Sequence, residues 1–126
     1  MLADFDIGAS LPASDINRAR AFYRDKLDLK PVDETPDGGM MFETGSSRFL
    51  VYPSVYAGTN KATAAAWEVT DIGSIVSELR SRGVTFQEYD FDEIKTVDGI
   101  ASLPDGNRAA WFYDSEDNIL GLFQRP

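Results

Sequence analysis

The sequence predicts an α+β fold made of two βαβββ modules. Two helical patterns of similar length predict it, each with a short apolar segment before it and several after it. A constant spacing relates the two copies, because the offset between the helix caps Asp15 and Asp71 also carries Gly8 to Ala64 in the two leading strands. We therefore expect a duplicated half-barrel unit.

The first module begins with an expected strand at residues 5–11 and a helix capped by Ser14 or Asp15. The helix covers residues 16–27, where apolar side chains recur at helical spacing and give one buried face. Three further strands follow, and turn residues separate them. We expect these strands at residues 29–34, 40–44 and 48–53.

The second module repeats this order. Its leading strand is expected at residues 63–69, and its helix at 72–83, with Gly83 as the C-terminal cap. Three strands are expected after the helix, at residues 84–90, 108–114 and 118–124. A chain of 126 residues matches one domain of ordinary size. We expect a single domain over residues 1–126, with module one at about 1–56 and module two at about 61–126.

The second module also contains a long connection at residues 90–107. Val51 and Gly121 occupy matching places in the last strands but lie further apart in sequence than the two helix caps, so the second copy is the longer one. Long loops are often functional. Its acidic side chains could attract a cationic ligand, and these are Asp92, Glu93 and Asp98. The loop could equally serve only to cover a sheet edge.

Composition limits the classes of partner. The net charge of −9 argues against nucleic acid and anionic membranes, because both require a positive surface. The N-terminus lacks the features of a signal peptide, and no apolar run is long enough to span a bilayer. Cysteine is absent, so neither disulfides nor thiolate chemistry is expected. We expect a cytoplasmic protein with a small-molecule partner.

The chain contains no histidine. Histidine is the commonest metal ligand and the usual general base near neutral pH. Neither a Ser-His-Asp triad nor a Cys-His pair can be assembled without it. Acid–base and covalent chemistry is left to Asp, Glu, Lys, Tyr, Ser and Thr.

Three segments resemble the vicinal-oxygen-chelate superfamily, which includes glyoxalases, bleomycin-resistance proteins and dioxygenases. They are LPASDINRARAFYRDKLDLKPV, WEVTDIGSIVSELRSRGVTF and AAWFYDSEDNILGLFQ, in the expected order over nearly the whole chain. The resemblance implies that the two modules pair into a cupped, barrel-like mixed sheet with the helices outside. It also implies a homodimer in which the second subunit completes each cleft.

The family binds its metal through four side chains from the first and last strands of each module. The matching positions are Gly8, Val51, Ala64 and Gly121, and none can bind a metal. A shift of one residue does not restore a set of ligands. We therefore expect no metal, no cofactor, and no metal-dependent glyoxalase, epimerase or dioxygenase activity.

These small and apolar residues predict an apolar cleft over the cupped sheet. Strand alternation adds neighbours to the cleft, and aromatic residues could either line it or only pack the core. The predicted ligand-binding residues are Gly8, Ser10, Phe42, Val51, Ala64, Ala66, Glu68, Trp111, Tyr113, Gly121 and Phe123, with Ile119 on the same face. Phe49 and Trp67 are further aromatic candidates.

Glu68 is the only ionisable residue predicted on its face of the leading strand. An isolated carboxylate in an apolar cleft has a raised pKa and can act as a general base or bind a cation. The simpler interpretation is that Glu68 lies in solvent or pairs with Arg48 or Arg108.

Three functions remain open. The first is metal-free binding of an aromatic or cationic small molecule, as in the antibiotic-sequestering branch of the family. The second is a metal-independent lyase or isomerase with Glu68 or Tyr113 as the proton-transfer group. The third is a protein-interaction module with collapsed clefts. The sequence favours binding over catalysis.

Overall fold

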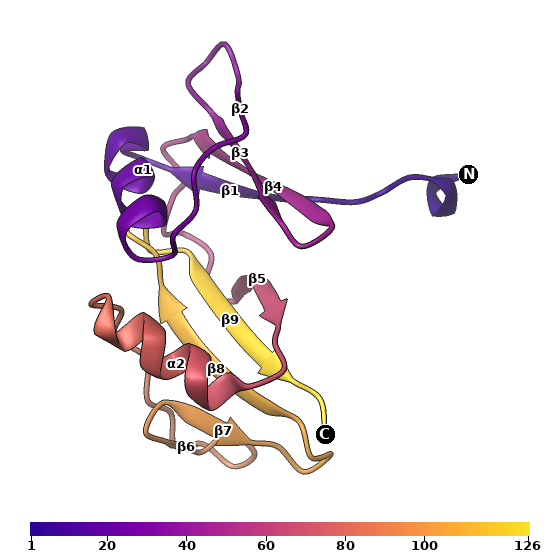
Figure 1. Cartoon of the computed structure of the whole chain (residues 1–126), viewed down its shortest axis with the longest axis vertical. Coiled ribbons are helices and arrows are strands. Elements are labelled where there is room, and N and C mark those ends of the chain that lie inside the picture. The colour runs from indigo at the N-terminus through magenta and orange to yellow at the C-terminus, as the bar shows by residue number, and fades with distance from the viewer.

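Two mixed β-sheets, each covered on one face by a helix, make up the protein (Figure 1). The structure is a computed structural model and describes all 126 residues. The sheets have four and five strands and do not close into a barrel. The predicted α+β class with a duplicated arrangement is therefore confirmed, and the two halves meet without a continuous hydrogen-bonded sheet.

The first sheet has the order β1-β4-β3-β2, with β1 parallel to β4 and the other pairs antiparallel. Helix α1 lies between β1 and β2 in the chain, as a βαβ crossover requires. The bounds are β1 Ala9–Ala13, α1 Ile16–Asp25, β2 Asp33–Glu34, β3 Met40–Thr44 and β4 Ser47–Pro53.

The second sheet repeats this topology with the order β5-β9-β8-β7-β6. Strand β5 is parallel to β9, and all other pairs are antiparallel. The bounds are β5 Thr63–Glu68, α2 Ile72–Ser81, β6 Thr96–Val97, β7 Ile100–Ser102, β8 Arg108–Tyr113 and β9 Ile119–Gln124. Neither helix is long and apolar enough to cross a membrane.

The helix starts agree with the sequence prediction. The Asp15 side chain accepts a hydrogen bond from the Arg18 amide at 3.0 Å, and Asp71 accepts one from the Ser74 amide at 3.2 Å. Each therefore satisfies one free N–H group of the first turn. The helices end slightly earlier than predicted. Asp28 follows the end of α1 and Gly83 follows the end of α2, with positive φ angles of 57° and 91°. A right-handed helix cannot continue through a residue in this conformation.

The prediction for residues 84–107 was wrong in part. Residues 84–90 form no strand, and a single isolated bridge, between Phe86 and Phe112, pairs this segment with β8. Strands β6 and β7 instead come from the predicted loop, and Ala101 of β7 pairs with Ala109 of β8. The two segments share one edge of β8, so neither runs along its full length. The longer connection of the second copy therefore extends the sheet.

One hydrophobic core runs through both halves. On α1, Tyr23 stacks on Phe42 at 5.2 Å between ring centroids, and Phe42 stacks on Phe49 at 5.2 Å. Phe49 meets Trp67 of β5 edge to face at 6.2 Å, and Trp67 lies parallel to Phe112 at 6.5 Å. This continuous series of aromatic rings joins the two sheets by dispersion and burial.

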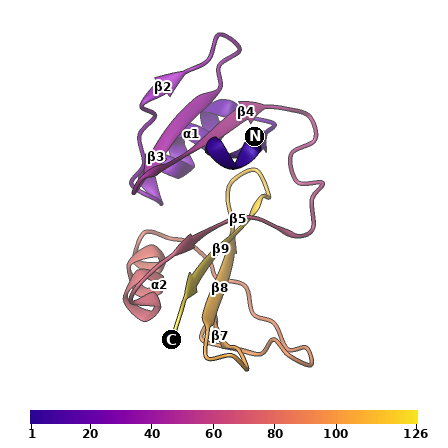
Figure 2. The ribbon, with the colours of Figure 1, turned by 90° about the vertical axis from the view of Figure 1, so that its right-hand side faces the viewer.

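A buried polar network also joins the two halves. The turn between β8 and β9 reaches from the second sheet toward the first half (Figure 2). Glu116 in this turn is 3% exposed and accepts hydrogen bonds from the Asp15 amide at 2.9 Å and from Arg18 Nε at 2.8 Å. Burial alone raises the pKa of Glu116, but these donors and Ser115 lower it to about 2. The carboxylate therefore stays charged and fixes the turn against the start of α1.

Asp114 completes this network. Its carboxylate accepts hydrogen bonds from the Tyr23 hydroxyl at 2.6 Å, the Asn118 side chain at 2.9 Å and the Glu116 amide at 2.8 Å. The Asn118 amide group also donates to the Pro12 carbonyl of β1 at 2.9 Å. Desolvation, together with the Asp114 charge, raises the pKa of Tyr23 well above its usual value. No buried side-chain polar atom lacks a partner, as folded interiors require.

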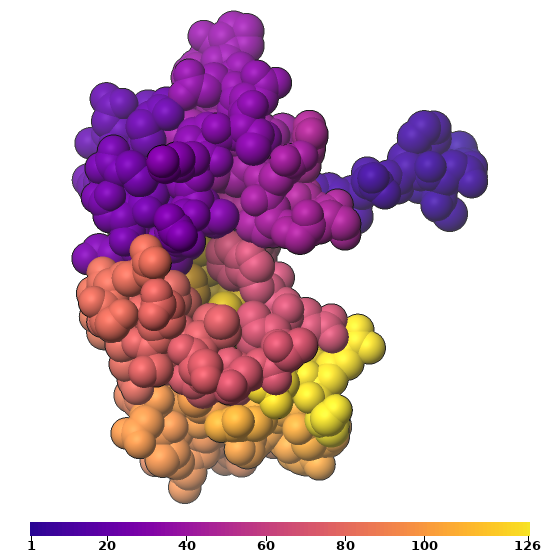
Figure 3. Space-filling model, viewed as in Figure 1, coloured from indigo at the N-terminus to yellow at the C-terminus, as the bar shows by residue number.

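Residues 1–8 form an arm that leaves the body of the molecule (Figures 1 and 3). The arm contains one short 3-10 helix, η1 (Leu2–Asp4), and every residue in it is exposed. Leu2, Phe5 and Ile7 are 73%, 72% and 97% exposed. The apolar side chains of the arm therefore stay largely in contact with solvent.

Candidate functional site

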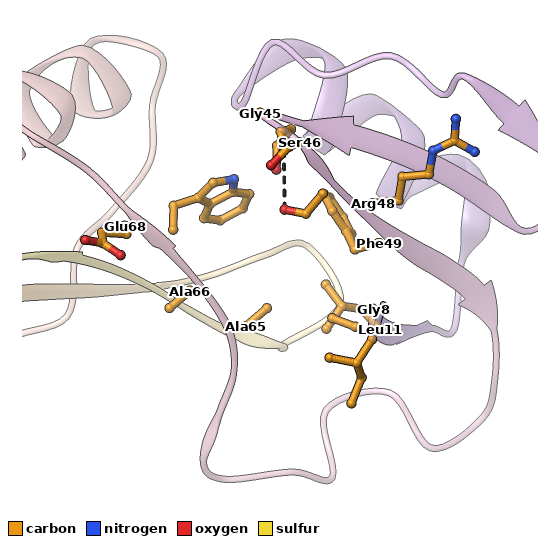
Figure 4. Close-up of a pocket in the computed structure, with 14 residues that line it drawn as sticks. Gly8, Leu11, Gly45, Ser46, Arg48, Phe49, Ala65, Ala66 and Glu68 are labelled. Carbon is orange, nitrogen blue, oxygen red and sulfur yellow. Dashed lines mark hydrogen bonds between the residues drawn. The ribbon is translucent and has the colours of Figure 1, made fainter. Parts of the chain in front are cut away.

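A cavity lies between the two sheets, where the start of β1 and the β3–β4 hairpin face β5 (Figure 4). It has a volume of about 600 Å³, within the usual range for small-molecule sites. It opens to solvent beside the base of the arm. The lining residues are 7–9, Leu11, 44–49 and 65–68.

The floor of the cavity is apolar. Leu11 and Phe49 contribute from the first sheet, and Ala65 and Trp67 from β5. Phe49 is 9% exposed, whereas Trp67 is half-buried and meets it edge to face. Small side chains beside two aromatic rings leave space for a flat apolar molecule.

The hairpin between β3 and β4 supplies the polar side of the cavity. Gly45 takes the left-handed conformation, with φ of 55°, which allows a tight turn between the two strands. Thr44, Ser46 and Ser47 place three hydroxyl groups at the rim, and Ser47 Oγ donates to the Thr44 carbonyl at 3.4 Å (Figure 4). The rim can donate and accept hydrogen bonds without carrying charge.

Two charged residues border the cavity, and each already has a partner. Arg48 pairs with Glu43 at 2.7 Å. Glu68 pairs with Arg125, whose Nε lies 2.8 Å from Oε1 and whose Nη2 lies 3.1 Å from Oε2. The Glu68 side chain is 48% exposed. It is therefore neither isolated nor desolvated, as a general base in an apolar cleft would be.

Three of the predicted site residues line this cavity: Gly8, Ala66 and Glu68. Gly8 passes close to β4, since a Cβ there would lie 3.0 Å from the Arg48 carbonyl oxygen. Ser10 is exposed further along β1 and does not line the cavity.

Four other predicted residues lie together on strands β8 and β9 of the second sheet. They are Trp111, Tyr113, Gly121 and Phe123. Trp111 pairs with Gly121, and a Cβ at Gly121 would meet Trp111 Cδ1 at 3.4 Å and Ala66 Cβ at 3.5 Å. Tyr89 packs edge to face on Trp111 at 5.6 Å. This part of the second sheet is aromatic but does not belong to the cavity.

The remaining predicted residues lie in the core or beside it. Phe42 and Val51 are fully buried within the hydrophobic cluster and do not line the cavity. Ala64 packs against this cluster at a bulge between Thr63 and Ala65, which interrupts the regular alternation assumed for β5. Ile119 is buried at the start of β9.

Several cavity residues were not among the predicted binding residues. Phe49 and Trp67 were noted only as aromatic candidates, and the hydroxyl groups of Thr44, Ser46 and Ser47 were missed. The GSS sequence signalled only a turn. The position of this turn over β5 depends on how the two sheets pack against each other, and no local sequence pattern encodes the packing of two sheets.

The side chains of the chain do not fit a divalent metal ion. No three Asp or Glu side chains come together, and His and Cys are absent from the sequence. Gly8, Val51, Ala64 and Gly121 carry no donor atoms in their side chains, whereas a catalytic metal needs about three protein ligands. The residues at the expected metal positions therefore could not hold the ion on which the family's usual chemistry depends.

Comparison with known structures supports the fold. A glyoxalase/bleomycin resistance protein from Catenulispora acidiphila is 17% identical with a TM-score of 0.73, covering 97% of this chain and 99% of that one. The fosfomycin resistance protein FosX from Listeria monocytogenes is 11% identical with a TM-score of 0.70, covering 97% and 93%. Lactoylglutathione lyase from Agrobacterium tumefaciens is 18% identical with a TM-score of 0.67, covering 95% and 92%.

At these identities the similarity concerns the fold alone. Among curated protein sequences none matches this chain. The family model for the Glyoxalase/Bleomycin resistance protein/Dioxygenase superfamily matches residues 7–108, which include β1 to β7 and the start of β8. The chain belongs to the Glyoxalase/Bleomycin resistance protein/Dioxygenase superfamily.

Proposed function

We propose that the protein binds a small aromatic molecule in the cavity between the two sheets and performs no metal-dependent chemistry. The observation that carries this proposal is the cavity itself. An apolar floor containing Phe49 and Trp67 faces three rim hydroxyl groups. Such a combination binds a flat ligand by apolar contact and orients it by a few hydrogen bonds.

The charges around the cavity favour a neutral ligand over a cationic one. Arg125 already neutralises Glu68, so a cation would have to displace an existing ion pair. Arg48 is occupied by Glu43 in the same way. The net charge of −9 still raises the local concentration of cations, but no unpaired carboxylate in the cavity would hold one.

Thermal denaturation with a panel of ligands tests the proposal. A neutral aromatic compound at about 100 times its Kd should add roughly 2.7 kcal/mol, which raises the Tm by on the order of 10 °C. A metal chelator should leave this rise in Tm unchanged. Stabilisation by divalent metals but by no organic compound would contradict the proposal.

Two variants locate the ligand. Ala66→Trp should fill the cavity from β5 and abolish the rise in Tm caused by the ligand. Val55→Trp is the control and should preserve this rise, because Val55 is 86% exposed and lies in the connection between the halves. Retained binding in Ala66→Trp would place the ligand elsewhere.

The alternative of a metal-independent enzyme depends on Glu68 or Tyr113. No observation favours it, since Glu68 is paired and Tyr113 lies on β8, outside the cavity. Glu68→Gln discriminates between the two functions. An enzyme would lose turnover in this variant, whereas a binding protein would keep its ligand.

We also propose that the protein is a homodimer. The exposed apolar arm and the outer edges of β1 and β5, which no strand of the chain covers, support it. Sedimentation velocity at micromolar concentration tests this proposal, and a single monomeric species would contradict it.

A further inference from the structure

A second cavity lies against helix α2 and shares only Trp67 with the proposed ligand site. It is a groove of about 210 Å³ between α2, the second sheet and the segment that follows α1. All eight lining residues are apolar. Leu27 and Leu29 come from the segment after α1, Ile75 and Leu79 from α2, and Leu122 from β9. Trp67, Val69 and Phe112 complete the lining.

The size of this groove suits a hydrocarbon group. An engineered apolar cavity of about 150 Å³ binds benzene, so 210 Å³ accommodates a somewhat larger chain or ring. The groove offers no hydrogen-bonding side chain apart from the Trp67 indole, and a polar ligand would lose its contacts with water there. An alkyl group would gain about fourfold in affinity for each buried methylene.

Positive charge lies beside the groove. Lys26 directly precedes the lining residue Leu27, and its side chain extends over Gly83 just past the end of α2, where a Cβ would collide with Nζ. Lys26 is half-buried and forms no ion pair. The nearest acidic neighbour on its C-terminal side, Asp28, faces Arg82 at 4.0 Å instead. Lys30, next to Leu29, is also unpaired.

We infer that this groove is a binding site for an amphipathic anion, with its alkyl chain between α2 and Leu27 and its carboxylate at Lys26. The free charge is unexpected in a chain with a net charge of −9, in which most arginines already have acidic partners. This site goes beyond the proposed aromatic site, because only Trp67 contributes to both.

Isothermal titration calorimetry with straight-chain carboxylates tests the inference. Octanoate should bind more tightly than hexanoate, by about fourfold for each added methylene. It should also bind more tightly than octylamine, which Lys26 would repel. Failure to bind octanoate at millimolar concentration, or equal affinity for the acid and the amine, would overturn the inference.

Two variants separate the contributions of head and chain. Lys26→Gln should weaken the binding of octanoate by about fivefold and leave the binding of 1-octanol unchanged, since only the ion pair with the carboxylate is lost. Ile75→Glu, at a 37% exposed position of α2, should abolish binding of both. Val55→Glu adds the same charge at an 86% exposed position outside the groove and should bind as wild type.

Unchanged octanoate binding in Ile75→Glu would place the molecule elsewhere and overturn the assignment. Sedimentation velocity with and without octanoate tests whether a second copy of the chain occupies the groove. A dimer that octanoate dissociates would mean that a second copy of the chain occupies the groove, which also overturns it. Binding of aromatic compounds in the cavity between the two sheets is measured separately, with Ala66→Trp. The two proposed sites can therefore be confirmed or contradicted independently of each other.

Discussion

At the scale of single residues, the hydroxyl of Tyr23 connects the two halves through Asp114. We expect Tyr23→Phe to destabilise the protein by about 1–2 kcal/mol, because the buried carboxylate loses one of its donors while keeping the others. Urea denaturation measures the change. Tyr52→Phe is the matched control, since the half-buried Tyr52 hydroxyl makes no hydrogen bond and its loss should change stability by less than about 0.5 kcal/mol. Equal effects would contradict the role of Tyr23.

Glu116 gives the protein a dependence on acid pH. Its pKa of about 2 in the folded state lies below the ordinary value of 4.5, so folding favours the charged form. The resulting stabilisation is complete above pH 4.5 and disappears as the pH falls toward 2. Solvent around the half-exposed Arg18 screens part of the effect, which leaves on the order of 2 kcal/mol.

Urea denaturation between pH 2 and pH 6 should therefore show a steeper loss of stability for the wild type than for Glu116→Gln. Glu34→Gln, which breaks the exposed ion pair with Arg20, should follow the wild-type profile closely. A Glu116→Gln profile parallel to that of the wild type would contradict the assignment.

Residue-level predictions from the sequence succeeded where the determinant is local. Asp15 and Asp71 were identified as caps because a cap depends on contacts within the first helical turn. The prediction that Val51 and Ala64 face a cleft assumed regular strands at the surface of a cup, whereas Val51 is buried and Ala64 lies at a bulge. The Glu68 partner, Arg125, is distant in sequence, and nothing in the local sequence indicates the pair.

At the scale of elements, the β6–β7 hairpin depends on Gly99. Its φ of 79° favours glycine, and a Cβ there would lie 2.9 Å from Phe86 Cβ. We expect Gly99→Ala to cost about 1–2 kcal/mol more than Gly38→Ala, as measured by urea denaturation. Gly38 has a similar φ of 90° with nothing within 4 Å of an added Cβ, so it isolates the conformational cost. Equal costs would contradict the close packing on Phe86.

Most elements could be predicted because their periodicity is clear, but not all of their bounds were right. The expected strand at residues 5–11 begins only at Ala9, and the one at residues 29–34 is reduced to Asp33–Glu34. Residues 84–107 could not be predicted. Segment 84–90 has the apolar content of a strand, yet β8 offers only one free edge, which Phe86 and Ala101 share. Competition between two segments for one edge is a tertiary effect. The β3–β4 turn, which places hydroxyl groups over the cavity, was similarly recognisable as a turn but not as part of a site.

At the scale of the whole molecule, the aromatic series and the Glu116 network join the two halves. We expect them to unfold together in one transition, in spite of the duplicated sequence pattern. Differential scanning calorimetry checks this through the equality of the calorimetric and van't Hoff enthalpies. Two resolved transitions would show that the halves are independent.

The exposure of the arm has a consequence for the covalent integrity of the chain. A protease acts on an exposed, extended segment long before it acts on folded strands, because cleavage requires local unfolding. Brief digestion with chymotrypsin should cut after Leu2 or Phe5 and leave residues from Asp6 onward intact, as mass spectrometry would show. Protection of the arm at high protein concentration would reveal that another surface shields it, so the rate of trimming also reports on assembly.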